Sequence, residues 1–306
     1  MTTKIPAAPS PAVLRYAAFT TDPSGGNPAG VVLDAAGLDD AAMLTIAADV
    51  GYSETAFLTA ARDGGDGDTS GQHYTARYFS PKAEVPFCGH ATVAAAVALA
   101  ERDGAVTGDG EEAAYVFATR AGTVPVAVSR AAGTVRATLT SVTPHVEEAA
   151  PDDVAEALAA LGWAADEPAA DLPPRIAFAG ARHLVIAAAT RARLARLDYD
   201  FARLEALMRR LDLTTVQLVW RASRYVFHAR DPFPVGGVVE DPATGAAAAA
   251  FGAYARELAL VPPDSVLTLH QGEDMGRPGV LTVTLREGDR RVRVSGAAVQ
   301  IPPAQA

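Results

Sequence analysis

Glu54 is the residue whose type and setting first suggest chemistry. It lies in Tyr52 to Thr59, a stretch that the sequence predicts to be a strand with mostly apolar residues on both faces. A carboxyl group there is at least partly buried, and desolvation raises its pKa toward neutrality, where it can both accept and return a proton. The strand pattern alone favours a plainer role, in which Glu54 pairs with an arginine or faces water at a strand end.

The motif Cys88-Gly89-His90-Ala91-Thr92 opens a predicted helix that runs from about Gly89 to Glu101. A glycine at a helix start lets the backbone approach a ligand closely, and the free N–H groups and helix dipole there favour a carboxylate. His90 could donate to that anion or pass on a proton. The spacing alone supports a structural role equally well, in which Gly89 fits a tight turn and His90 caps the helix locally.

The segment from Glu240 to Gly245 opens a second predicted helix, Gly245 to Leu258, in the same way. Asp241 followed by Pro242 is also the usual N-cap and N1 pair of a helix, and taken singly that interpretation is the better one. The case for function is that both helix entrances combine a polar residue with a glycine. Two helix N-termini that converge on a cleft could hold a carboxylate and stabilise charge as a carbon acid loses its proton.

Other kinds of site find little support. The single cysteine, Cys88, excludes a disulfide within the chain and any multi-thiolate metal site. As a nucleophile with His90 it would lack a third, orienting group, so a small buried cysteine is the better interpretation. The six histidines show no H-x-x-x-H or similar spacing, and no dinucleotide-binding, P-loop or G-x-S-x-G pattern occurs. The sequence therefore predicts no metal site.

Charge and hydropathy exclude two classes of partner. Lys and Arg total 26 against 36 Asp and Glu, and the net charge of −10 disfavours binding to nucleic acid or anionic lipid. The N-terminus lacks the apolar region of a signal peptide, and the longest apolar run elsewhere, Val93 to Ala100, is too short to span a bilayer. We therefore expect a cytoplasmic protein.

The elements that must position these residues follow one plan used twice. Arg77 to Pro81 precedes a short loop, Gly89 and an Ala-rich helix, and Arg230 to Pro234 precedes a short loop, Gly245 and another Ala-rich helix. A helix that is apolar all round is buried all round, so each half is expected to fold around its helix. Two such halves facing each other would leave a cleft between them, a common place for a ligand.

This repeat predicts an α+β fold of two pseudo-symmetric halves, residues 1–135 and 136–306, with the change at about 130 to 145. A composition rich in Ala, Pro and acidic residues marks the start of the second half, and a C-terminal strand at about 288–306 could return to the first half. The Gly- and Asp-rich stretch from Arg62 to Gln72 is expected to be a hairpin loop.

Five short motifs carry a family resemblance. They are Gly26-Asn27-Pro28-Ala29, Ser53-Glu54-Thr55-Ala56-Phe57, Cys88-Gly89-His90-Ala91-Thr92, Glu240-Asp241-Pro242-Ala243-Thr244-Gly245, and Gln271-Gly272 followed by Gly276-Arg277-Pro278. In order and approximate spacing, from about residue 15 to 300, the chain resembles the phenazine-biosynthesis PhzF-like family. The resemblance implies a diaminopimelate epimerase-type fold, with a curved sheet or barrel around a central helix in each half. It also implies isomerase chemistry without metal or organic cofactor, and commonly a homodimer.

The resemblance assigns roles to individual residues. In the family's phenazine enzyme, the Glu of the S-E-T motif shuttles a proton between carbons of a cyclohexadiene carboxylic acid, and that role falls on Glu54. Proton-assisting and ligand-holding roles fall on His90, Asp241 and the substrate-binding positions Gly89, Thr244, Gly245 and Ala246. The family commonly has Ser at position 246, so Ala246 removes a hydroxyl expected to help bind substrate. Ser24 likewise replaces a usual aromatic residue.

Three functions remain open. The leading one is a cofactor-free isomerase that moves a proton between carbons of a small carboxylic acid, expected to be cyclic, through Glu54 alone. The two-cysteine mechanism of related racemases and epimerases is excluded because Cys88 has no partner cysteine. The first rival is a non-catalytic small-molecule binder, which is favoured by Ala246 in place of the usual serine. The second is a tautomerase or cyclase of a natural-product pathway.

Overall fold

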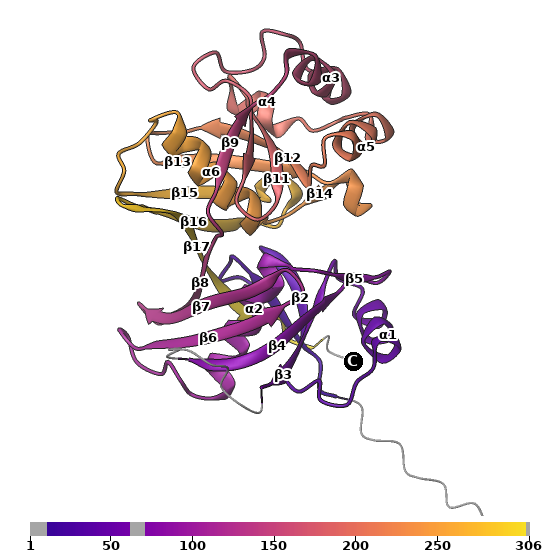
Figure 1. Cartoon of the computed structure of the whole chain (residues 1–306), viewed down its shortest axis with the longest axis vertical. Helices are drawn as coiled ribbons and strands as arrows, with labels where there is room; N and C mark the ends of the chain where they lie inside the picture. Colours follow the sequence, from indigo (N-terminus) through magenta and orange to yellow (C-terminus); the bar gives the residue numbers. More distant parts are fainter. Residues whose placement is uncertain (1–10, 62–70, 304–306) are drawn as a thin grey trace, which may run out of the picture.

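The computed structural model describes residues 11–61 and 71–303. Within these residues the chain forms two halves, which lie one above the other in Figure 1, and each half folds a sheet around a long helix. The predicted α+β class is therefore confirmed. The predicted loop from Arg62 to Gln72 falls mostly on residues 62–70, which lie outside the described part of the chain.

The first half is a closed ring of strands. Its elements are β1 (Leu14–Ala18), β2 (Asn27–Val32), α1 (Asp40–Val50), β3 (Thr55–Ala60), β4 (Gln72–Phe79), β5 (Glu84–Val85), α2 (Gly89–Arg102), β6 (Glu112–Thr119), β7 (Gly122–Ala131), β8 (Thr134–Thr140) and, from the end of the chain, β17 (Asp289–Gln300). Hydrogen bonds run in the order β1, β2, β3, β4, β6, β7, β8, β17 and back to β1. Helix α2 fills this ring, and α1 packs on its outside.

The second half is a curved sheet that covers the other long helix. Its elements are β9 (His145–Glu148), α3 (Pro151–Leu161), β10 (Arg175–Phe178), β11 (Arg182–Ala187), α4 (Arg191–Ala195), α5 (Phe201–Arg210), β12 (Thr215–Arg221), β13 (Val226–Pro232), η1 (Pro234–Gly236), β14 (Glu240–Asp241), α6 (Gly245–Glu257), β15 (Ser265–Gln271), η2 (Glu273–Met275) and β16 (Gly279–Arg286). Helix α6 lies on the inner face of this sheet, and α3, α4 and α5 form a separate apolar cluster on its outer face.

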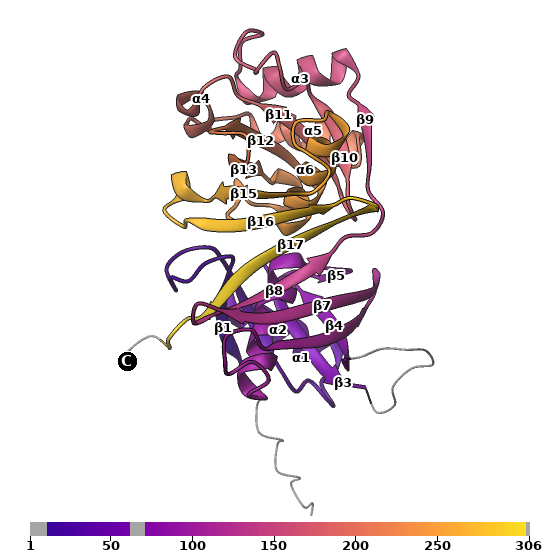
Figure 2. The ribbon, with the colours of Figure 1, turned by 90° about the vertical axis from the view of Figure 1, so that its left-hand side faces the viewer.

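Strand β17 belongs to both halves. Its first residues pair with β16 of the second half, and its later residues pair with β8 and then with β1 of the first half. Figure 2 shows it running from one half into the other. Because one strand completes both sheets, the two halves are hydrogen-bonded to each other rather than joined by a loose linker.

The repeated plan is visible at the level of single residues. In the first half, β4, the short strand β5, helix α2 and the parallel strand β6 follow one another; in the second half, β13, β14, α6 and β15 do the same. Tyr78 pairs with Val85 in the first half, as Asp231 pairs with Asp241 in the second. Asp241 therefore occupies the place that the apolar Val85 holds in the other half, and only one half carries an acid there.

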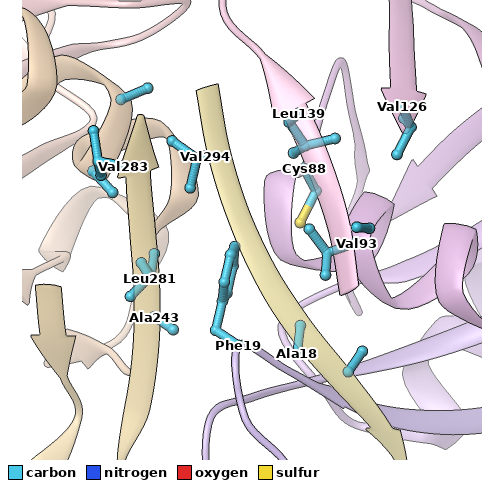
Figure 3. Close-up of a cluster of buried hydrophobic side chains, with 14 of the residues drawn as sticks. Ala18, Phe19, Cys88, Val93, Val126, Leu139, Ala243, Leu281, Val283 and Val294 are labelled. Carbon is cyan, nitrogen blue, oxygen red and sulfur yellow. The ribbon is translucent and has the colours of Figure 1, made fainter. Parts of the chain in front are cut away.

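The two Ala-rich helices are buried as the sequence predicts. Every α2 residue from His90 to Ala100 is buried, as is nearly every α6 residue from Gly245 to Ala255. Their small side chains let strands approach the helix axis closely. Phe19 seals the junction: its ring lies beside β17 among the apolar side chains of both halves (Figure 3), and a Cβ at Gly296 would overlap that ring.

The structure corrects two details of the predicted elements. The strand expected from Tyr52 begins only at Thr55, because pairing with β2 and β4 begins there, so Glu54 immediately precedes the strand. Strand β10 was not predicted from the sequence, because both its central residues are buried and it shows no alternation of apolar and polar residues. Among the described residues, no helix is long and apolar enough to cross a membrane.

Candidate active site

One pocket, of about 490 Å³, collects the residues singled out by the sequence. It lies between the halves, with walls from the β5–α2 and β14–α6 connections and from the start of β11. All seven predicted site residues line it: Glu54, Gly89, His90, Asp241, Thr244, Gly245 and Ala246. The structure therefore brings together residues that are up to 192 positions apart in the sequence, from Glu54 to Ala246.

The two long helices begin against each other at this pocket. A Cβ placed on Gly89 would lie 3.8 Å from Gly245 Cα and 4.0 Å from Ala246 N. The two N-cap residues, Cys88 and Thr244, make no side-chain cap hydrogen bond. First-turn N–H groups of both helices are therefore directed at one place, which favours an anionic group of a ligand.

Asp241 does not cap α6. The helix begins at Gly245 with Thr244 at the N-cap, and Asp241 instead lies in β14, so the N-cap interpretation is wrong. Its buried carboxylate accepts hydrogen bonds from Asn27 Nδ2 (2.8 Å) and Thr244 Oγ1 (2.6 Å). Burial raises the pKa of Asp241, while the nearby His90 and these hydrogen bonds oppose the rise. Asp241 therefore holds the side chain of Asn27 from the first half and that of Thr244 from the second.

Glu54 lies at the rim of β3 with its side chain 16% exposed, so the expected partial burial is confirmed. Its Oε2 is 3.4 Å from His90 Nε2 and 3.6 Å from Cys88 Sγ, which donates to it. These partners replace the arginine of the plainer interpretation. Burial raises the pKa of Glu54, and hydrogen bonds from Ser53 and Cys88 oppose the rise. A carboxylate with a raised pKa is a stronger base than an exposed one.

His90 is buried in the first turn of α2 and makes no local cap. Its Nδ1 lies 3.1 Å from Asn27 Nδ2, and its Nε2 lies 3.3 Å from Ser53 Oγ, so both nitrogens contact segments far away in the sequence. Burial lowers the pKa of His90, although Asp241 opposes this. A neutral imidazole results, able to donate one N–H and accept at the other nitrogen.

Cys88 is a buried thiol, as expected. Burial raises the pKa of Cys88 well above its ordinary value, and the neighbouring Glu54 carboxylate adds to the rise. A thiol that stays protonated is a poor nucleophile. The raised pKa therefore supports the interpretation of Cys88 as a small buried residue rather than a nucleophile.

Three further residues complete the site. Asn27 Nδ2 donates to Asp241 and to the carbonyl of Ala243 (3.0 Å), which ties the first half to the entrance of α6. Gln271 accepts from Thr244 N (3.0 Å) and donates to the carbonyl of Asp241 (2.8 Å). Ser53 contacts His90. Each stands in one of the five motifs, and that membership was the signal that could have identified it.

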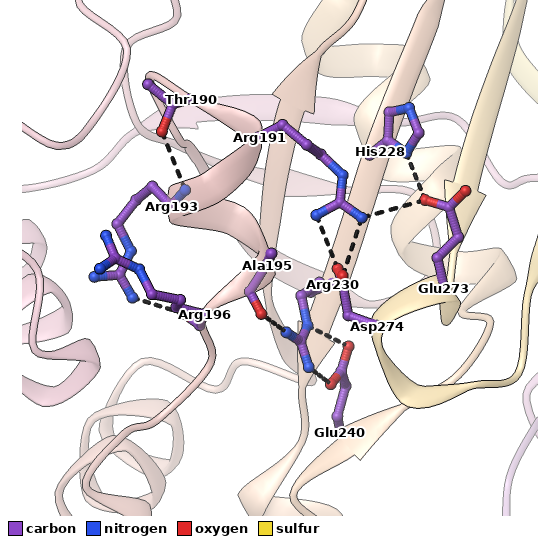
Figure 4. A network of polar contacts seen from close by, with 10 residues as sticks. All are labelled: Thr190, Arg191, Arg193, Ala195, Arg196, His228, Arg230, Glu240, Glu273 and Asp274. Atoms are coloured by element: carbon purple, nitrogen blue, oxygen red, sulfur yellow. Dashed lines mark hydrogen bonds and ion pairs between the residues drawn. The ribbon is translucent and has the colours of Figure 1, made fainter.

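An ion pair inside the second half fixes the strand that carries Asp241. Arg230 Nε donates to Glu240 Oε1 (2.9 Å), and Arg230 Nη1 donates to the carbonyl of Ala195 (2.7 Å) (Figure 4). The first half has the equivalent pair, Arg77 to Glu84, at 2.8 Å. The repeated Arg–Glu fork therefore anchors the short strand before each buried helix.

A buried polar chain lies behind this strand, on the face of the sheet that packs on α6. His183 Nδ1 and Thr215 Oγ1 share a hydrogen bond of 2.8 Å, and Thr215 Oγ1 donates to Asp231 Oδ1 (2.7 Å). All three residues are buried. Desolvation raises the pKa of Asp231 well above its ordinary value, and the Asp241 carboxylate adds to the rise. Burial therefore favours the protonated form of the Asp231 carboxyl group.

Replacing Asp231 with Asn is expected to stabilise the protein increasingly as the pH rises. An acid whose pKa is raised on folding contributes stability below its unfolded pKa of about 3.9, and this contribution is lost as the pH rises through the folded pKa. Asn keeps the shape without that titration. The measurement is the free energy of unfolding in urea over a pH series.

Asp289→Asn is the matched control and should show the opposite slope. Hydrogen bonds from Arg291 lower the pKa of Asp289 to about 2, so the native carboxylate stabilises the protein above its unfolded pKa and the benefit disappears in acid. A difference between Asp231→Asn and the native chain that does not change with pH would contradict the assignment.

Comparisons with known proteins identify the family of the chain. A family model described as "Phenazine biosynthesis-like protein" (PhzC-PhzF) matches residues 16–302. "Uncharacterized isomerase YddE" of Escherichia coli K12 is 33% identical over 297 residues, covering 94% of this chain and 96% of that protein. The crystal structure of a PhzF-family phenazine biosynthesis protein from Bacillus anthracis is similar with a TM-score of 0.81 and 25% identity, covering 95% of this chain and 96% of that one.

A more distant similarity concerns the fold alone. A hydroxyproline epimerase from Agrobacterium vitis has a TM-score of 0.62 at 13% identity, covering 94% of this chain and 90% of that one. The epimerase-type architecture implied by the motifs is thereby confirmed. Five ordered motifs, the matching family model and isomerase relatives over nearly the whole chain lead to one conclusion: the chain belongs to the phenazine biosynthesis-like (PhzC-PhzF) family and is an isomerase.

Proposed function

We propose that this isomerase moves a proton between two carbons of a small carboxylic acid, with Glu54 as the single acid and base and without metal or organic cofactor. The observation that carries the proposal is the placement of a partly buried Glu54, with its raised pKa, in the same pocket as two facing helix N-termini. A base and an anion-binding place are the two parts that this reaction needs.

The proposed reaction has two balanced steps. Ionised Glu54 takes a proton from a carbon conjugated with the substrate carboxylate, and the electron pair of that C–H bond delocalises toward the carboxylate. N–H groups at Gly89 and Gly245 stabilise the added charge. Protonated Glu54 then returns the proton to a different carbon, and the electron pair forms the new C–H bond. Neutral His90, in contact with Glu54 Oε2, orients the carboxyl group through both steps.

The pocket wall supports a flat, cyclic substrate. The aromatic side chains of Phe87, Phe178 and Phe233 line it, together with the backbone-rich helix entrances. Such rings offer apolar faces to a planar ring, and polar side chains, among them Glu54 and Arg182, share the same lining. Ala246 presents a methyl group to the pocket, so recognition at this position rests on its backbone N–H.

Deuterium uptake from D2O tests the proposal. The native enzyme is incubated in D2O with a panel of cyclic and amino carboxylates, and exchange at carbon is followed by NMR. We expect at least one acid to exchange at carbon. Binding without exchange across the panel would favour the non-catalytic binder, and formation of a new ring would favour the cyclase.

Two further expectations accompany this proposal. The family resemblance implies a homodimer, and we propose a cytoplasmic location. Size-exclusion chromatography with light scattering tests the first by giving the mass of the particle in solution.

Replacing Gly89 with Ala is expected to weaken ligand binding about 10- to 100-fold, as when one hydrogen bond to a charged group is lost. The added methyl group would meet its nearest neighbours at ordinary contact distance, 3.8 Å or more, so the fold should be unaffected. It would lie against Ala246 N, where the anion is expected. Calorimetric titration with an exchanging acid measures the effect.

Gly108→Ala serves as the control, because a Cβ at this half-buried glycine, which lies outside the pocket, would meet only the flexible side chain of Glu111. Equal affinities for the Gly89→Ala, Gly108→Ala and native proteins would show that the space between the helix starts does not hold the ligand.

A further inference from the structure

Three side chains with different metal-ligating atoms meet in the pocket. Glu54 precedes β3, Cys88 is the N-cap residue of α2, and His90 lies in the first turn of that helix. Cys88 Sγ lies 3.6 Å from Glu54 Oε2 and 3.7 Å from His90 Nε2, and His90 Nε2 lies 3.4 Å from Glu54 Oε2. The sulfur, nitrogen and oxygen therefore form a nearly equilateral triangle.

This triangle has the dimensions of one face of a zinc tetrahedron. Bonds of about 2.3 Å to sulfur and about 2.0–2.2 Å to nitrogen and oxygen give ligand–ligand edges of about 3.6 Å for S–N and S–O and about 3.4 Å for N–O. The three observed distances agree with these edges. We propose that Glu54, Cys88 and His90 form a reversible binding site for Zn²⁺ or a similar thiophilic divalent cation.

Charge and access agree with the proposal. On binding the cation, the Cys88 thiol releases its proton to solvent. The thiolate and the Glu54 carboxylate then supply two negative charges against the two positive charges of the cation, and neutral His90 supplies the third ligand. All three residues line the 490 Å³ pocket, so the fourth coordination position is open to water or a ligand. The buried Asp241 lies close enough to act electrostatically on Cys88 and adds to the negative potential.

The surroundings of His90 predict an exchangeable ion rather than a structural one. With zinc on Nε2, the proton of the ring lies on Nδ1, which needs an acceptor. The neighbours of Nδ1 are Asn27 Nδ2 (3.1 Å), a donor whose hydrogens are directed to Asp241 and Ala243, and Cys88 Sγ (3.4 Å), which would itself bind the metal. The lack of a suitable outer partner costs about 10- to 100-fold in metal affinity.

Metal binding and the proposed reaction exclude each other, because the cation would occupy the oxygen of Glu54 that takes the proton. The site would thus make the enzyme sensitive to inhibition by zinc. Inhibition depends on the proposed function of Glu54, whereas metal binding itself does not, so a metal-binding measurement tests the proposal even if the reaction is a different one.

Cobalt titration of the metal-stripped, full-length chain tests the site. Co²⁺ reports its ligands directly: we expect one equivalent to bind, with a thiolate-to-cobalt absorption band in the near ultraviolet, and Zn²⁺ to displace it. The absence of the band, or of stoichiometric binding, would overturn the proposal.

Variants then identify the ligands. Cys88→Ser, His90→Asn and Glu54→Gln are each expected to lower the zinc affinity at least about tenfold, and Cys88→Ser to remove the thiolate band. The matched control is His145→Asn, which disrupts a His–carboxylate contact of 3.1 Å to Glu147 on the surface. Unchanged affinity in the three pocket variants, or a loss confined to His145→Asn, would place the metal elsewhere. Circular dichroism confirms that each variant is folded.

Discussion

Replacing Glu54 with Gln is expected to lower the rate of proton exchange at substrate carbon by about 10²- to 10⁴-fold, the usual contribution of a positioned acid–base group. Gln keeps the size of the side chain and can still contact Cys88 and His90, but it cannot accept a proton. Substrate binding should change little, because in the proposed function the N–H groups of the helix starts, and not Glu54, hold the substrate carboxylate. Deuterium uptake gives the rate, and calorimetry gives the affinity.

The pH dependence of the same reaction provides a second test of Glu54 as the base. Burial raises the pKa of Glu54, so the ionised base disappears at a higher pH than for an exposed glutamate. We expect kcat/KM to fall as the pH decreases through this raised pKa. Glu101→Gln is the control, since Glu101 accepts a hydrogen bond from Tyr16 (2.7 Å) outside the pocket. Exchange at the native rate in Glu54→Gln would remove Glu54 from the mechanism.

Replacing Glu240 with Ala is expected to lower the free energy of unfolding by about 3–5 kcal/mol, the cost of leaving one charge of a buried pair without its partner. The side chains of Arg230 and Glu240 are only 10% and 3% exposed, so water cannot replace the lost carboxylate. Strand β14 would lose the ion pair to Arg230 that fixes it, so the position of Asp241 in that strand would also be less well fixed. Urea denaturation measures the change.

An exposed pair of the same geometry provides the control. Arg203 and Glu156 also form two hydrogen bonds, of 2.7 and 2.8 Å, but their side chains are 43% and 38% exposed. Glu156→Ala should therefore cost at most about 1 kcal/mol. Equal losses in the two variants would contradict the role of burial. If Glu240→Ala does not fold, the double variant Arg230→Met, Glu240→Leu should, because an apolar pair of similar volume avoids the unpaired charge.

Local patterns predicted the helices and the repeat well. The Ala-rich helices begin at Gly89 and Gly245, as expected from glycine at their starts and from apolar residues on every side. These features depend on neighbours within one or two turns, which the sequence displays directly. Patterns failed where local and long-range signals compete: the Asp241-Pro242 pair resembles a helix cap, yet pairing with β13 places Asp241 in a strand.

The candidate site shows the same division. Its members were recognised through motifs, but the strand pattern of Glu54 and the spacing of Asp241 each favoured a structural role on their own. Asn27 and Gln271 stood in motifs without an assigned role, because amide side chains show their function only through the partners that they join. The ligand triangle of Glu54, Cys88 and His90 matches no spacing rule, since its oxygen comes from a segment that precedes the helix by more than thirty residues.

The sequence by itself determined two similar halves, their buried helices, a glycine at each helix start and the absence of a second cysteine. Composition and periodicity set these features, because they act through local backbone preference and side-chain size. Only the tertiary structure decided that the two helix starts face each other, that β17 joins both sheets, and that Glu54 lies against His90 and Cys88 rather than an arginine. Distances of this kind are set by strand pairing across the whole chain, and no local segment contains them.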